Sequence, residues 1–141
     1  MTTRRSFIKS STLASTLAFP AVLRAQPAGT PAPNQRLNVA IIGAGGRGGA
    51  AVQGMKDENI VAICDVDAAR LAAKKKQFPD AATYTDWREL LEKEKNLDSV
   101  NVSTPDHMHA PIAMSALNRG LAVYCQKPLT HTLHECRRLA E

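Results

Sequence analysis

The chain is 141 residues long, which is room for one domain of ordinary size. Its net charge of +5 is concentrated near the start: four of the 18 basic residues lie among the first 25 residues beside no acid, and the other 14 nearly balance the 13 acidic residues. The composition therefore excludes a basic patch for nucleic acid. The one basic run, residues 74–76, is typical of a solvated helix face.

Residues 1–25 resemble a twin-arginine export signal. Arg4 and Arg5 are followed by an aromatic residue, an aliphatic residue and a lysine, and a moderately apolar run extends to residue 23. That run is too short and too polar to span a bilayer. We expect a signal peptide, the twin-arginine export machinery as a partner, a periplasmic or otherwise exported location, and no stable membrane anchor. The alternative is a basic tail with no export function.

Residues 26–36 are rich in proline, alanine and glycine, which is typical of a linker. From residue 37 onward, runs of strand length alternate with runs of helix length. The predicted strands cover residues 37–42, 60–64, 82–84, 99–103 and 121–125. The predicted helices cover residues 46–56, 68–77, 86–95, 110–119 and 132–141, with Asp67 and Asp86 as N-caps and Gly120 as a stop. This order predicts an α/β fold over residues 37–141, a doubly wound parallel sheet with helices on both faces.

The last predicted helix has no stop signal. Cys136, Leu139 and Ala140 mark one expected buried face, and residue 141 follows without a cap. We expect the chain to be a fragment, or a truncated reading frame, of a longer protein.

The first predicted strand leads directly into the sequence G-x-G-x-x-G, with glycines at 43, 45 and 48. In a dinucleotide-binding loop, Gly43 makes the tight turn, Gly45 lets the pyrophosphate approach the backbone, and Gly48 lets the next helix pack close to the strand. Gly46 and Arg47 stand where that helix opens. Its free N–H groups and positive dipole end suit phosphate.

The second predicted strand ends in Asp65, 20 residues after Gly45. A Rossmann unit places there the carboxylate that binds the adenosine ribose. Asp65 favours NAD because a carboxylate repels a 2′-phosphate, while Arg70 and Lys74 lie near enough in sequence to leave NADP open. The alternative is a glycine turn followed by a helix-capping aspartate.

The cysteines and histidines show no metal-ligand pattern. Cys64, Cys125 and Cys136 lack C-x-x-C spacing, and an odd number argues against a full set of disulfides. His107 and His109 form an isolated H-x-H that no cluster of acids or cysteines supports. We therefore predict no metal site.

Two further stretches carry a family resemblance. Thr104, Pro105 and His109 form T-P-x-x-x-H after the fourth predicted strand, and Lys127 and Pro128 follow the fifth. Together with the glycine loop, they resemble the glucose–fructose oxidoreductase, inositol dehydrogenase and MocA family, in the expected order over residues 37–141. The resemblance implies that Thr104 and Pro105 line the cofactor and that His109 starts the next helix beside it. It also implies that Lys127 is a catalytic residue, which lies near the nicotinamide ribose and the substrate hydroxyl.

Gln126 departs from the family pattern, which has glutamate before the lysine. The amide keeps the shape and hydrogen-bonding capacity of glutamate but loses the charge that favours the ammonium form of Lys127. We count Gln126 among the expected cofactor contacts.

The resemblance implies the NAD(P)-binding domain of an exported oxidoreductase, acting by hydride transfer on a secondary alcohol of a sugar, sugar derivative or cyclitol. The C-terminal α/β substrate domain of the family, which holds the base, is missing from this chain. We therefore expect these 141 residues to be inactive by themselves. The resemblance is also compatible with a homo-oligomer of the full-length protein. The alternatives are an NAD-dependent glycosidase that uses transient oxidation, and a non-catalytic nucleotide-binding fragment.

Overall fold

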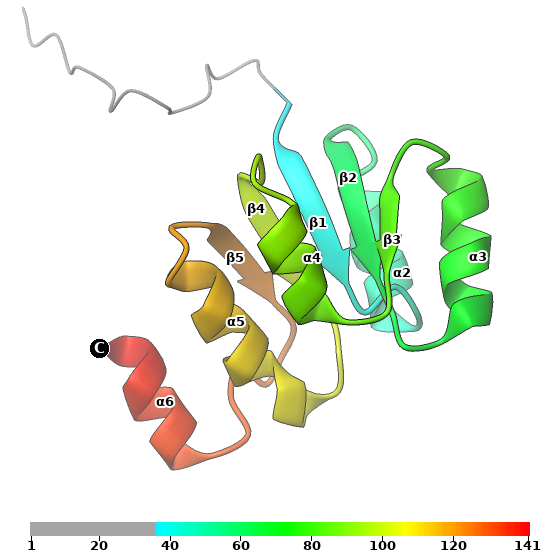
Figure 1. Ribbon diagram of the computed structural model, residues 1–141. Coiled ribbons are helices and arrows are strands. Elements are labelled where there is room, and N and C mark those ends of the chain that lie inside the picture. Colours follow the sequence, from blue (N-terminus) through cyan, green and yellow to red (C-terminus); the bar gives the residue numbers. More distant parts are fainter. Residues whose placement is uncertain (1–35) are drawn as a thin grey trace, which may run out of the picture. The chain divides into compact units, whose positions relative to one another are not determined.

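One five-stranded parallel sheet forms the centre of the computed structural model, which describes residues 36–141 (Figure 1). The predicted signal peptide and nearly all of the predicted linker lie outside the described residues. The strands are β1 (Asn38–Ile42), β2 (Asn59–Cys64), β3 (Ala82–Tyr84), β4 (Ser99–Val102) and β5 (Ala122–Cys125). Their order in the sheet is β3-β2-β1-β4-β5, and every neighbouring pair is parallel. The predicted strands and the parallel pairing are confirmed, with ends that agree within one residue.

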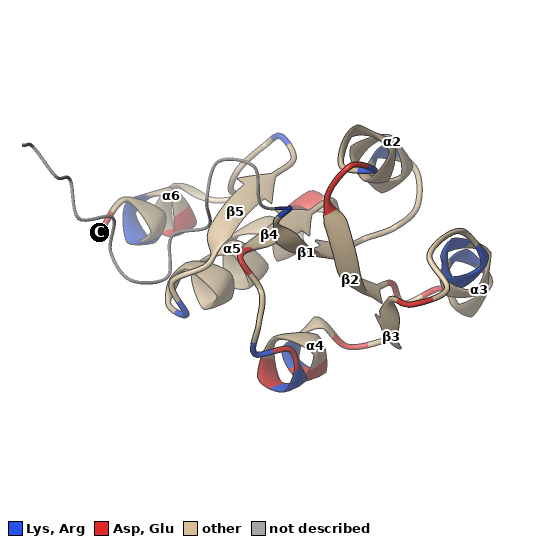
Figure 2. Ribbon diagram, turned by 90° about the horizontal axis from the view of Figure 1, so that it is seen from above, with Lys and Arg blue, Asp and Glu red and all other residues tan. Residues whose placement is uncertain are grey.

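Helices cover both faces of this sheet (Figure 2). They are α2 (Arg47–Gly54), α3 (Ala68–Gln77), α4 (Trp87–Lys93), α5 (His109–Leu117) and α6 (Leu133–Ala140), with a short 3₁₀ helix η1 (Asp106–Met108) before α5. Because successive residues of a strand point to opposite faces, Val39 and Ile41 pack with α2 and α3, while Ala40 and Ile42 pack with α4 and α5. The doubly wound arrangement predicted from the sequence is confirmed.

The residues predicted to begin or end helices, Asp67, Asp86 and Gly120, do so in the structure. The Asp67 carboxylate accepts hydrogen bonds from the backbone N–H groups of Ala69 and Arg70 at 2.8 and 3.3 Å, which caps α3. Asp86 caps α4 by accepting from the Arg88 N–H at 2.8 Å. Gly120 follows α5 with φ of 76°, a left-handed conformation that ends the helix.

The last helix differs from its prediction in burial. Thr132 and Glu135 form a capping box that begins α6, but none of its residues is buried, and Cys136 and Ala140 are exposed. Leu133 is 67% exposed. The predicted buried face of this helix is therefore wrong, because α6 packs against α5 and not against the sheet. Within residues 36–141, no helix has both the length and the apolar character needed to cross a bilayer.

Candidate functional site

The glycine loop lies at the carboxyl end of β1 and is held from two sides. The Gly43 N–H donates to the carbonyl of Cys64 at 2.8 Å, and a Cβ on Gly43 would lie 2.6 Å from the backbone carbonyl of Ser103. A Cβ on Gly48 would lie only 1.8 Å from the carbonyl oxygen of Gly43. The first and third glycines are thus required by close backbone contact, which the sequence predicts for Gly48, and Gly43 also has a φ of 88°. The third glycine also allows α2 to begin against the loop.

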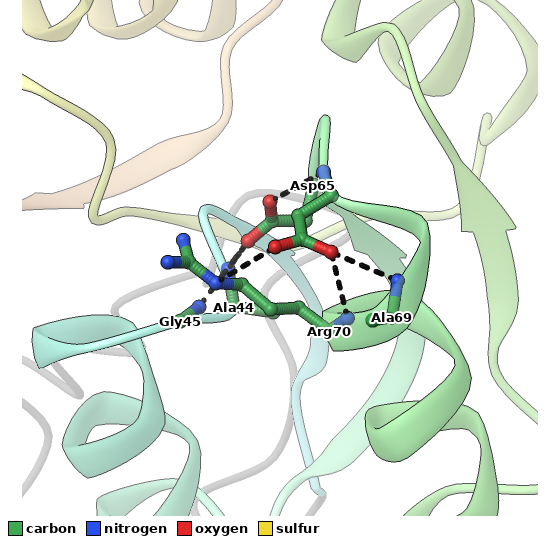
Figure 3. A network of polar contacts seen from close by, with 6 residues as sticks. Ala44, Gly45, Asp65, Ala69 and Arg70 are labelled. Atoms are coloured by element: carbon green, nitrogen blue, oxygen red, sulfur yellow. Dashed lines mark hydrogen bonds and ion pairs between the residues drawn. The ribbon is translucent and has the colours of Figure 1, made fainter.

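Asp65, at the end of β2, binds this loop directly (Figure 3). Its Oδ2 accepts from the N–H groups of Ala44 and Gly45 at 2.9 and 3.2 Å, and its Oδ1 accepts from the N–H of Asp67 at 3.0 Å. The residue is 7% exposed. The structure therefore brings Asp65 and the glycine loop together, and it adds a loop-fastening role that the sequence did not reveal.

Arg70 lies over the middle glycine (Figure 3). Three of its side-chain atoms are 2.7–2.8 Å from the position that a Cβ on Gly45 would take, and its Nε is 3.4 Å from Asp67 Oδ2. The absence of a side chain at Gly45 thus gives room to a guanidinium. The sequence placed Arg70 near Asp65 along the chain, but only the fold shows that it reaches the loop.

Two cavities flank the loop at the carboxyl edge of the sheet. The first, of about 300 Å³, lies between the loop, Asp65, Arg70 and the segment after β4. The second, of about 460 Å³, is lined by the following residues: Arg47, Ser103, Thr104, Asp106, His109, Gln126 and Lys127. Both stand beside the point where the strand order reverses between β1 and β4, which is where open α/β sheets bind ligands.

Thr104 connects the two cavities and suits a polar ligand. It lines both, and its buried Oγ1 has no hydrogen-bond partner within residues 36–141. The buried Nε1 of Trp87, a residue that lines the first cavity, also lacks a partner in that part of the chain. Such groups are costly unless a ligand or water satisfies them, so the residues fit a ligand rich in acceptors.

His109 and Lys127 both line the second cavity, but His109 is buried and Lys127 is exposed. The His109 ring is 2% exposed, with Nδ1 2.6 Å from the carbonyl oxygen of Pro128 and Nε2 2.7 Å from that of Thr104. Lys127 is exposed on the turn between β5 and α6, and within residues 36–141 it makes no ion pair. Gln126 lies beside it and donates its N–H to Val102 at 2.9 Å.

Cys64 lies next to Asp65 and lines the first cavity, but its thiol is unreactive at neutral pH. Burial, together with the Asp86 and Asp65 carboxylates, raises the pKa of its thiol to about 12. Cys64 is thus a buried free thiol. Within residues 36–141, no group of three or more histidines, cysteines or acids is placed to hold a metal ion.

Comparison with known proteins finds relatives that resemble part of this chain in sequence. The chain is 36% identical over 83 residues to inositol 2-dehydrogenase of Salmonella typhimurium, an alignment that covers 58% of this chain and 24% of the relative. It is 32% identical over 147 aligned residues to a glycosyl hydrolase family 109 protein of Stenotrophomonas maltophilia, covering 94% of this chain and 31% of the relative.

A solved structure agrees in fold. Myo-inositol dehydrogenase from Lactobacillus casei, in complex with NAD(H) and myo-inositol, matches with a TM-score of 0.69 and 26% identity, covering 75% of this chain and 32% of that one. The chain spans about a quarter to a third of the length of the curated relatives it matches. Residues 37–141 match the model of the oxidoreductase family with an NAD-binding Rossmann fold, and the chain therefore belongs to the Gfo/Idh/MocA family.

Proposed function

We propose that this chain binds NAD along the carboxyl edge of its sheet, as the cofactor domain of an oxidoreductase that acts on a secondary alcohol. The observation that carries the proposal is the fastening of the glycine loop by Asp65, with one cavity on each side of the segment after β4. The names of the relatives, several of which are inositol dehydrogenases, support a cyclitol, a sugar or a sugar derivative as the substrate.

In this proposal, the adenosine end of NAD takes the first cavity. The pyrophosphate is bound by the loop from Gly45 through Gly46 to Arg47, where α2 begins. The N–H groups of Gly48 and Gly49 already donate to the carbonyls of Gly45 and Gly46 at 2.8 and 3.1 Å, so the pyrophosphate is bound by the N–H groups of Gly46 and Arg47. Asp65 accepts hydrogen bonds from the ribose hydroxyls. Thr104 and Pro105 line the passage to the second cavity.

The nicotinamide end takes the second cavity, which Gln126 and Lys127 line. NAD, when bound, supplies the acceptor for a hydride from the alcohol carbon, and the hydroxyl proton passes to a base that the family resemblance places in the substrate domain. The Lys127 ammonium donates a hydrogen bond to the alcohol oxygen and so orients the reacting carbon. Gln126 offers an amide to the same space without adding a negative charge.

Calorimetric titration of the chain with NAD tests this proposal. We expect binding, and we expect Asp65→Ala to weaken it by at least about tenfold, which is about 1.4 kcal/mol. Asp98→Ala is the matched control, because its carboxylate also accepts a backbone N–H, that of Asn38 at 2.8 Å, where β1 begins at the other edge of the sheet. Equal NAD affinity in Asp65→Ala and wild type would remove Asp65 from the site.

A second candidate function rests on the glycosyl hydrolase family 109 relative, whose alignment covers 94% of this chain. An NAD-dependent glycosidase oxidises and then re-reduces its substrate, so it cleaves a glycoside with no net NADH. An oxidoreductase accumulates NADH from a free cyclitol or sugar. Measuring NADH with a free cyclitol, and aryl release with an aryl glycoside, separates the two in the complete enzyme.

We also propose that residues 1–25 direct export by the twin-arginine route, which supports a periplasmic location. The proposal rests on Arg4 and Arg5 and the run that follows them. Fusing residues 1–35 to a folded reporter tests it. Replacing both arginines by lysine should abolish export, whereas Arg24→Lys, which keeps the pair, should not. Export that survives the double replacement contradicts the proposal.

A further inference from the structure

The buried ring of His109 joins two loops that border the second cavity. One of its contacts is the carbonyl of Thr104, in the segment after β4, and the other is the carbonyl of Pro128, in the turn after β5. The distances are 2.7 and 2.6 Å, and the residue is 2% exposed. Both nitrogens are therefore used by the backbone, so the ring itself has no free polar atom for a ligand.

Both partners are carbonyl oxygens, which only accept hydrogen bonds. Each ring nitrogen that carries hydrogen can therefore donate to the carbonyl it faces, and the ring lies within hydrogen-bond distance of both oxygens. The charged side chains that line the same cavity are those of Arg47, Asp106 and Lys127.

The contact between His109 and Pro128 is important because the turn that carries Lys127 makes few other hydrogen bonds to the rest of the described residues. Among residues 36–141, the carbonyl of Pro128 provides the one hydrogen bond made by residues 127–130. The neighbouring anchors lie at the ends of the turn, where Gln126 donates to Val102 and His131 donates to Glu135. The position of Lys127 therefore depends on the His109 ring.

We propose that His109 is a positioning residue: its buried ring, in contact with the carbonyls of Thr104 and Pro128, ties the turn of Lys127 to the segment of Thr104 and so sets where Lys127 stands in the second cavity. The family resemblance implies only that His109 starts the helix beside the cofactor. The inference about Lys127 rests on the proposed function, in which the second cavity takes the nicotinamide end, but the tie itself does not.

Nitrogen NMR of the chain labelled at histidine tests the tie without any ligand. We expect a ring N–H signal of His109 that exchanges slowly with water, because the ring is buried and donates to a backbone carbonyl, with the signal assigned by its loss in His109→Gln. A His109 ring whose N–H exchanges as fast as that of the exposed His134 overturns the proposal. Because this measurement uses the wild-type chain, it stands even if a variant at position 109 does not fold.

Calorimetry with NAD and with ADP-ribose then tests the positioning of Lys127. We expect wild type to bind NAD more tightly than ADP-ribose, which lacks nicotinamide, and His109→Gln to weaken NAD binding about tenfold while changing ADP-ribose binding less than about twofold. His134→Gln, an exposed histidine on α6, is the matched control and should change neither affinity.

Equal weakening of both ligands in His109→Gln, unchanged NAD binding in that variant, or equal affinity of wild type for the two ligands contradicts the positioning role. Wild type that binds neither ligand contradicts the proposed function instead, and the nitrogen spectrum then still decides whether the tie exists.

Discussion

At the scale of single residues, position 48 requires glycine because a backbone atom occupies the space that a side chain would need. A Cβ there would lie 1.8 Å from the carbonyl oxygen of Gly43, and neither side can yield without moving α2 away from β1. We predict that Gly48→Ala lowers the free energy of unfolding by at least about 3 kcal/mol. Urea denaturation measures this change.

Gly54 provides the control for that substitution, because it belongs to the same helix and a Cβ there would meet nothing within 4 Å. Gly54→Ala should leave the free energy of unfolding unchanged or raise it by about 0.5 kcal/mol. If the two alanine variants have the same stability, the close contact at Gly48 does not exist in solution.

The three cysteines should react at very different rates with a thiol reagent. Cys136 is exposed, while Cys64 is buried and its pKa is raised to about 12, so it holds almost no thiolate at neutral pH. We predict that the native chain is modified first at Cys136 and that Cys64 reacts only on unfolding. In Cys136→Ser, rapid modification of Cys64 under native conditions would contradict this.

At the scale of elements, α6 depends on its first turn. The Glu135 carboxylate accepts from the N–H groups of Thr132 and His131, both at 2.8 Å, and these bonds, the one from Thr132 first, lower the pKa of Glu135. A lowered pKa means that the stabilisation is present above the unfolded pKa and is lost as the pH falls through the folded one.

We therefore predict that α6 loses amide protection as the pH falls below about 4, while α5 keeps it. Hydrogen exchange followed by NMR measures both helices in one sample. Glu135→Gln should remove the pH dependence of α6 by weakening its start at every pH. If α6 in wild type is equally protected at pH 7 and at pH 3, the capping box does not hold the helix.

Elements were predictable where their signals are local. Asp67 and Asp86 cap helices two or three residues ahead, so sequence spacing is enough to find them. The burial of α6 was not predictable, because an apolar stripe does not say whether a sheet or only one helix lies opposite. The bonds of Asp65 to the loop and of His109 to Pro128 join residues 19 to 21 positions apart, and their geometry follows from the fold alone.

At the scale of the whole sheet, β1 is the central strand. Its neighbours β2 and β4 are each paired on both sides, whereas the outer strands β3 and β5 each have one partner strand within residues 36–141. We predict the slowest amide exchange in β1 and faster exchange in β5, because opening an outer strand breaks fewer contacts. Uniform protection across all five strands would contradict this order.

The carboxylate of Asp65 has a consequence for how any sugar is recognised. It already accepts three hydrogen bonds from its own chain, two at Oδ2 and one at Oδ1. A carboxylate has about four acceptor positions, so one position, at Oδ1, stays open. A first hydroxyl can therefore bind Asp65 without displacing a peptide N–H, whereas a second hydroxyl can bind only by displacing one.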